Sequence, residues 1–147
     1  MSDLNNLYQE IILDHSKRPR NFRKMDEETV RSEGYNPLCG DKITLQLKVD
    51  GGKVTDASFQ GSGCAISTAS ASLMTEALKG KTREQAEELF QRFLQLLRGD
   101  ASAQSDLGKL QVFSGVCDYP MRVKCATLAW HAMRAALQGA GDLVSTE

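Results

Sequence analysis

The chain has 147 residues, 41% of them hydrophobic and 25% charged, with a formal net charge of −1 and a pI of about 6.1. This composition is typical of one globular domain, and the near-neutral charge argues against nucleic acid or an anionic membrane surface as a partner. The apolar runs are too short to span a bilayer, and the N-terminus lacks the features of a signal peptide. We therefore expect a cytoplasmic protein that forms a single domain over residues 1–147.

The first half of the chain predicts one helix followed by a hairpin. Apolar residues at helical spacing predict a helix over Asp3–Ser16. The polar, charged segment Ser16–Pro37 is interpreted as a long surface loop. Strict alternation over Ile43–Val49 then predicts a half-buried strand, and Asp50-Gly51-Gly52 is a hairpin turn signal. The return strand is expected over Val54–Gly61.

The second half of the chain is predicted to be helical. A small-residue segment over residues 65–80 predicts a helix that ends at a glycine. A capping box begins a second helix over residues 82–99, and residues 100–109 are interpreted as a loop. A last helix is expected over 121–138, followed by a frayed tail at 142–147. The order of elements predicts an α+β fold, with a small antiparallel β-sheet packed against several α-helices.

The four cysteines are Cys39, Cys64, Cys117 and Cys125. A chain of this length with no secretion signal does not need disulfides, so spaced cysteines favour metal ligands or reactive thiols. Cys117 is interpreted as a small buried hydrophobic residue outside any site.

The other three cysteines and one aspartate are expected to converge. Gly40 lets the backbone turn tightly between Cys39 and Asp41. A hairpin returns the chain to its starting point, so Cys64, just after the return strand, should lie near both. Cys125 lies early in the final helix. Three thiolates and a carboxylate suit a tetrahedral Zn²⁺ or iron, although Gly40 and Asp41 could instead serve only as turn and capping residues.

The histidines and the basic residues have simpler interpretations. His15 is interpreted as a cap at the C-terminus of the first helix, where the dipole favours a cation, and His131 as a packing or surface residue. The basic run after the first helix is either a solvated face or a docking patch for an acidic partner: Lys17, Arg18, Arg20, Arg23 and Lys24.

Four segments together resemble a known family. They are LYQEIILDHSKRPRN, NPLCGD, GSGCAIS with the following SASLMTEALKGK, and KCATLAW. They resemble the U-type iron–sulfur cluster assembly proteins, the group that contains IscU, SufU and the N-terminal domain of NifU. The resemblance extends from about Leu7 to Leu137.

Within that family the sequence is most similar to the SufU subtype. Lys124 stands where IscU proteins carry a histidine before the third cysteine. An additional helix and loop, Glu87–Asp106, separates the second and third cysteines. The segment DYPMR, residues 118–122, replaces the motif by which IscU proteins engage an Hsp70 chaperone.

The resemblance implies a role for each matching residue. Cys39, Asp41, Cys64 and Cys125 would bind Zn²⁺. Cys39 would be the catalytic residue, taking persulfide sulfur from a SufS-type PLP-dependent cysteine desulfurase. The protein would then be a zinc-dependent sulfurtransferase-like carrier rather than an independent turnover enzyme. It would supply a SufBCD-type scaffold or apo iron–sulfur proteins.

Three other functions are weighed against this one. The chain could itself be a scaffold that assembles a 2Fe–2S cluster on the three cysteines and then transfers it. The metal would then be iron rather than zinc. It could be a zinc-stapled interaction module without sulfur chemistry. A Cys-His hydrolase is the weakest hypothesis, because no motif places His15 or His131 beside a cysteine.

Overall fold

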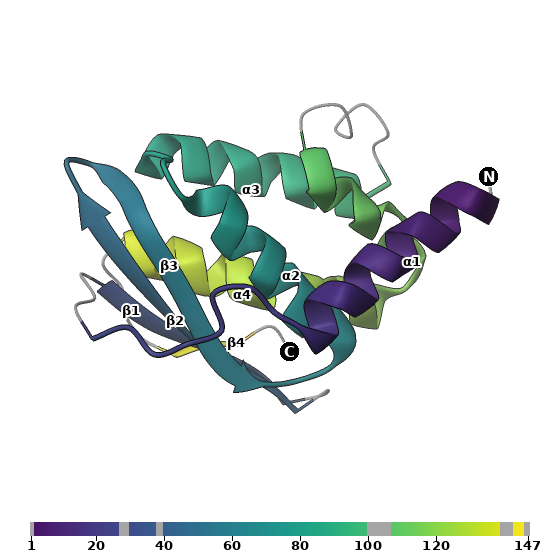
Figure 1. The fold of residues 1–147 in the computed structure, drawn as a ribbon, viewed down its shortest axis with the longest axis horizontal. Helices are drawn as coiled ribbons and strands as arrows, with labels where there is room; N and C mark the ends of the chain where they lie inside the picture. Colours follow the sequence, from purple (N-terminus) through teal and green to yellow (C-terminus); the bar gives the residue numbers. More distant parts are fainter. Residues whose placement is uncertain (1, 27–29, 38–39, 100–106, 139–142, 146–147) are drawn as a thin grey trace.

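The computed structural model describes residues 2–26, 30–37, 40–99, 107–138 and 143–145 (Figure 1). The elements in chain order are α1 (Ser2–Lys17), β1 (Val30–Asn36), β2 (Asp41–Asp50), β3 (Lys53–Ser62), α2 (Ala65–Leu78), α3 (Arg83–Leu97), the 3₁₀ helix η2 (Gly108–Asp118), α4 (Pro120–Leu137) and β4 (Leu143–Ser145).

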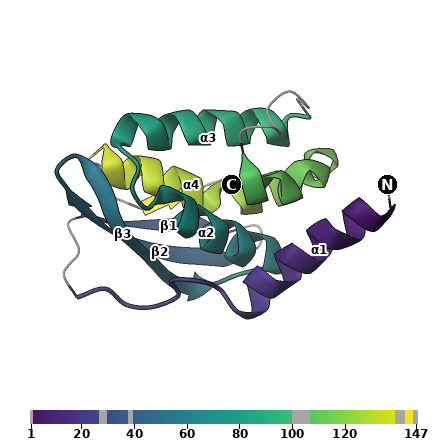
Figure 2. The same cartoon turned by 45° about the horizontal axis from the view of Figure 1, so that its top comes forward.

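The fold is α+β, as the sequence predicts. One sheet has the strand order β3-β2-β1-β4, with antiparallel pairing except between β1 and β4. Figure 2 shows α2 and α4 covering one face of the sheet, with α3 stacked on the far side of α4. The core between these layers is centred on fully buried aromatic side chains: Phe90, Phe93, Phe113 and Trp130. None of the described helices is both long and apolar enough to cross a membrane.

The hairpin that the sequence predicts is confirmed. β2 and β3 pair antiparallel, and Gly51 and Gly52 form the turn with φ of 60° and 79°. Both angles lie in the left-handed region, where glycine has no steric penalty. At the open end of the hairpin Lys42 pairs with Ser62, so the residues just outside this pair are held side by side.

The predicted loop over Ser16–Pro37 is wrong in its last part, because β1 occupies Val30–Asn36. The inward-facing residues of β1 are Ser32, Gly34 and Asn36, all of them buried. They are small or polar, so the strand carries no apolar alternation. Its position depends on close packing: a Cβ on Gly34 would lie 3.0 Å from a side-chain carbon of Leu128 on α4.

The frayed tail predicted for residues 142–147 is wrong over residues 143–145, while residues 142, 146 and 147 lie outside the described residues. Leu143–Ser145 forms β4, which pairs in parallel with Glu33–Tyr35 of β1. The reason is that the outer edge of β1 presents unpaired backbone N–H and C=O groups, which an adjacent extended segment can satisfy.

The predicted helices of the second half are confirmed as α2, α3 and α4. Gly80 has a φ of 84° just after α2, and Thr82 with Gln85 forms the capping box of α3. The predicted loop at 100–109 lies outside the described residues as far as residue 106. The helix η2 that follows was not predicted from the sequence.

Candidate metal centre

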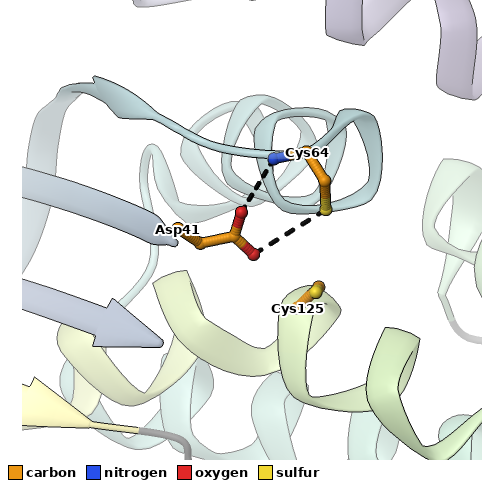
Figure 3. A group of neighbouring side chains, drawn as sticks. All are labelled: Asp41, Cys64 and Cys125. Carbon is orange, nitrogen blue, oxygen red and sulfur yellow. Dashed lines mark hydrogen bonds between the residues drawn. The ribbon is translucent and has the colours of Figure 1, made fainter. Parts of the chain in front are cut away.

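Asp41 begins β2 and is completely buried. Its Oδ1 accepts a hydrogen bond of 2.8 Å from the backbone N–H of Cys64, and its Oδ2 lies 3.7 Å from the Cys64 sulfur (Figure 3). The carboxylate therefore joins the two ends of the hairpin. This contact confirms the sequence-based expectation that Asp41 and Cys64 lie close together.

The glycines before Cys64 allow this close approach. Gly61 has a φ of 148°, and a Cβ there would lie 2.1 Å from the carbonyl oxygen of Lys42. A Cβ on Gly63 would lie 2.7 Å from Asp41 Oδ1. The GSG sequence thus lets two strands and a buried carboxylate come together at one point.

Cys64 is the N-cap residue of α2. Its sulfur accepts a hydrogen bond of 3.4 Å from the backbone N–H of Ser67, one of the amides that a helix N-terminus leaves without an intrahelical partner. The side chain is exposed to solvent. Its sulfur is therefore held in one direction yet remains accessible.

Cys125 is buried on α4 and completes the cluster in the described part of the chain. One oxygen of Asp41 and the sulfur atoms of Cys64 and Cys125 all lie within 4.8 Å of one another. In Figure 3 the three side chains, from β2, α2 and α4, point into one space. Cys39 lies outside the described residues, and so does the side chain of Cys117.

This donor set fits a metal ion. Zinc–sulfur bonds of about 2.3 Å in a tetrahedron place neighbouring ligand atoms about 3.7 Å apart, which needs only small movements from the observed positions. Two sulfur atoms and one carboxylate oxygen suit Zn²⁺, and they also suit iron. A fourth ligand would have to come from outside this trio.

An open groove leads to the two cysteines. Its volume is about 830 Å³, and Cys64 and Cys125 both contribute to its wall. The remaining lining comes from α1, η2 and the starts of α2 and α4, with these apolar side chains: Tyr8, Ile12, Leu13, Ala65, Ile66, Val112, Val116, Tyr119 and Met121. No local pattern predicts this groove, because its walls come from opposite ends of the chain.

His15 does not act as the helix cap that the sequence predicts. Although it lies in the last turn of α1, it is 2% exposed and its Nδ1 lies 2.7 Å from Ser72 Oγ on α2. The Ser72 oxygen accepts the N–H of Arg20, so the hydroxyl proton is free to point at Nδ1. Burial first, and then the positive charge of Arg20, lower the pKa of His15. A neutral ring that fastens α1 to α2 gains nothing from a helix dipole.

This contact predicts that stability falls in acid. The folded-state pKa of His15 lies below its ordinary value of 6.5, so the unfolded chain binds the proton more readily. The free energy of unfolding should therefore decrease as the pH falls below about 6.5. The charged residues that act on the ring are Asp14, Arg20, Glu76 and Lys109.

Urea unfolding at pH 7.5 and 5.5 checks this expectation. His15→Asn keeps an acceptor for Ser72 but cannot be protonated, so its loss of stability between the two pH values should be smaller than that of the unchanged protein. An equal loss in both proteins would show that His15 does not contribute.

The remaining sequence interpretations have mixed outcomes. His131 is a packing residue, with its ring edge-on to Phe90 at 5.1 Å, and burial lowers its pKa. Within the basic run, Arg20 pairs with Asp14 and Arg23 with Asp56, each at 2.6 Å. Those two arginines therefore have partners within the molecule.

Fold and site together define an α+β protein in which one aspartate and two cysteines form a group that could hold a metal ion. Residues 7–138 match the family described as the NifU-like N terminal domain. The chain belongs to this family, the U-type iron–sulfur cluster assembly proteins. Its structure resembles that of a protein from Fervidobacterium islandicum AW-1 assigned as an iron–sulfur cluster assembly scaffold for the SUF system, with a TM-score of 0.83, 38% identity, and coverage of 90% and 98% of the two chains.

Two curated relatives are each 44% identical to the chain. One is the iron–sulfur cluster assembly scaffold protein IscU of Streptococcus pyogenes, with 94% of this chain and 87% of the relative aligned. The other is the zinc-dependent sulfurtransferase SufU of Bacillus subtilis, with 90% of each aligned. The two relatives belong to one family, but their names describe different tasks: one is a scaffold and the other a sulfurtransferase.

Proposed function

We propose that the protein is a zinc-bound sulfur acceptor that takes persulfide sulfur from a SufS-type cysteine desulfurase for iron–sulfur cluster assembly. The observation that carries this proposal is the convergence of Asp41, Cys64 and Cys125 beside an open groove. A purely structural zinc site has no need of an accessible wall, whereas an acceptor of sulfur does.

Zn²⁺ would be held by Asp41, Cys64 and Cys125, with Cys39 as the fourth ligand. A bound zinc ion would supply charge that keeps thiols deprotonated and shielded from oxidation. Asp41 would contribute through Oδ2, because Oδ1 is already occupied by the N–H of Cys64. The hydrogen bonds of Asp41 and of the Cys64 cap therefore hold these two ligands in place without a metal ion.

The sulfur transfer itself would take place at Cys39. Its thiolate attacks the terminal sulfur of the desulfurase persulfide, a carbon–S–S–H group. The S–S bond of the donor breaks, a new S–S bond forms on Cys39, and the donor cysteine leaves as a thiolate. No external oxidant or reductant is required. The carried sulfur would pass on to a SufBCD-type scaffold or to apo iron–sulfur proteins.

The alternative function is a scaffold that builds a 2Fe–2S cluster on the same residues, as the name of the Streptococcus pyogenes relative says of that protein. Lys124 supports the sulfur-acceptor function instead. Its ammonium cannot replace a histidine as a ligand of a 2Fe–2S cluster. Within the group of Asp41, Cys64 and Cys125, this leaves Asp41 as the one candidate ligand that is not a thiol. The zinc-dependent Bacillus subtilis relative supports the same choice.

Persulfide mapping tests the proposal. The zinc-loaded protein is incubated with a SufS-type desulfurase, PLP and cysteine, alkylated, digested and analysed by mass spectrometry. We expect an added mass of about 32 Da, one sulfur atom, on Cys39, together with faster release of alanine. Cys39→Ser should abolish both effects.

Cys117→Ser is the matched control, since it removes a thiol outside the proposed ligand set and should behave like the unchanged protein. No adduct and no change in alanine release, with zinc bound, would refute sulfur acceptance. Anaerobic reconstitution with iron and sulfide, followed by transfer to an apo-protein, would then separate the scaffold from a zinc-stapled module.

A further inference from the structure

A buried hydrogen-bond link joins the two helices that carry Cys64 and Cys125. Ser70 of α2 is fully buried, and its hydroxyl donates to the backbone carbonyl of Ala126 on α4 at 2.5 Å. The same oxygen accepts the indole N–H of Trp130 at 3.0 Å. The hydroxyl thus uses its single proton on Ala126, and Trp130 holds it in that direction.

In the chain, this hydrogen-bond link lies close to both Cys64 and Cys125. Ala126 directly follows Cys125, so the bond is made to the carbonyl of the residue next to the buried thiol of the proposed metal site. Cys64 is the N-cap of α2, roughly two turns from Ser70. The two sulfur atoms come from different helices, and their separation therefore depends on how α2 packs against α4.

Apolar packing does not by itself fix this separation in one direction. One turn along α2 from Ser70, Leu73 and Met74 are buried, and the burial of such side chains is favourable without being directional. A hydrogen bond is directional, and one made to a backbone carbonyl specifies the axial position of both helices. At Ser70 it specifies the position of the carbonyl of Ala126, the residue after Cys125.

We infer that Ser70 is a positioning residue for the metal centre: its bond to the Ala126 carbonyl, oriented by Trp130, sets the distance between the Cys64 and Cys125 sulfur atoms. The inference rests on the metal centre of the proposed function, but not on sulfur transfer. It assigns to Ser70 an effect on metal affinity that a residue with only a packing role does not have.

Ser72 provides a matched control on the same helix. It is also fully buried, and its hydroxyl also makes two contacts, with His15 Nδ1 at 2.7 Å and with the N–H of Arg20 at 2.8 Å. These contacts fasten α1 rather than α4. Ser70→Ala and Ser72→Ala therefore remove the same atom from equally buried positions, with different consequences for the metal centre.

Zinc affinity is measured by competition with a chromophoric chelator. We expect Ser70→Ala to bind zinc about tenfold more weakly than the unchanged protein, the lower range for loss of a group that orients a ligand. Ser72→Ala should stay close to the unchanged protein, even if both variants unfold at similarly lowered temperatures. Equal zinc affinities in the two variants would overturn the inference.

A metal-free measurement gives a second readout. In a background with Cys39 and Cys117 changed to serine, the remaining thiols can form one disulfide by exchange with oxidised glutathione, releasing two molecules of reduced glutathione. The fraction of protein that carries this disulfide at equilibrium reports how closely the fold holds the Cys64 and Cys125 sulfur atoms. It should change in Ser70→Ala and stay unchanged in Ser72→Ala, and equal fractions in both would contradict the inference.

Trp130→Phe covers the case in which Ser70→Ala does not fold. It removes the indole N–H that orients the Ser70 hydroxyl, so zinc affinity should again fall, and an unchanged affinity would count against Ser70. The outcomes remain separable from those of the proposed function. If the unchanged protein binds no zinc, the proposed function fails while the disulfide measurement still tests Ser70.

Discussion

Replacing Cys125 by alanine is expected to abolish tight zinc binding and to remove the stabilisation that zinc provides. Cys125 is buried on α4 and supplies one of the two described sulfur donors. A metal that binds only the folded state adds about 4 kcal/mol to the free energy of unfolding when free zinc is 1,000 times its Kd. The variant should lose this amount, which urea unfolding in zinc-buffered solution measures.

A strong chelator should produce the same loss in the unchanged protein and have no further effect on Cys125→Ala. Cys117→Ala is the matched control, and it should keep both its zinc and its sensitivity to the chelator. A Cys125→Ala protein that still holds one zinc per chain with unchanged affinity would remove Cys125 from the proposed ligand set.

Replacing Gly61 by alanine is expected to cause the largest loss of stability among single substitutions in the hairpin. The new Cβ would lie 2.1 Å from the carbonyl oxygen of Lys42 and 2.9 Å from the Cα of Ile43, both backbone atoms that cannot turn away. The φ of 148° is also strained for any residue with a side chain. We expect a loss of about 3 kcal/mol or more.

Zinc affinity should fall together with stability in this variant. The strand must shift to relieve the clash, and that shift displaces Cys64 from Asp41, which accepts its N–H at 2.8 Å. Gly51→Ala is the control, because its φ of 60° is also positive but no atom lies within 4 Å of its new Cβ. That variant should lose only about 1 kcal/mol and keep its zinc affinity. Similar losses in the two variants would show that the close approach at Gly61 has no special cost.

The meeting of Asp41 and Cys64 could be predicted because it depends on local rules. A two-glycine turn pairs adjacent strands, and the pairing of Lys42 with Ser62 places the flanking residues together. The capping box of Thr82 and Gln85 is local in the same sense, since both of its hydrogen bonds join residues three apart. Contacts of this kind can be predicted from the spacing of residues in the sequence alone.

β1 and His15 could not be predicted in this way. The buried side of β1 consists of Ser32, Gly34 and Asn36, so its burial depends on α4 approaching a glycine rather than on apolar side chains. The position of His15 at a helix end indicates a charged cap, yet its contact with Ser72 lies 57 residues away in the chain. Neither feature leaves a periodic signal.

The four α-helices, the hairpin and the first pair of site residues follow from the sequence, because turn chemistry and side-chain periodicity act within a few residues. The convergence of Cys125 with that pair depends on the packing of α4 against α2. The groove beside the cysteines and the link through Ser70 depend entirely on this packing. Contacts between distant segments are decided by how buried surfaces fit together, which no local pattern records.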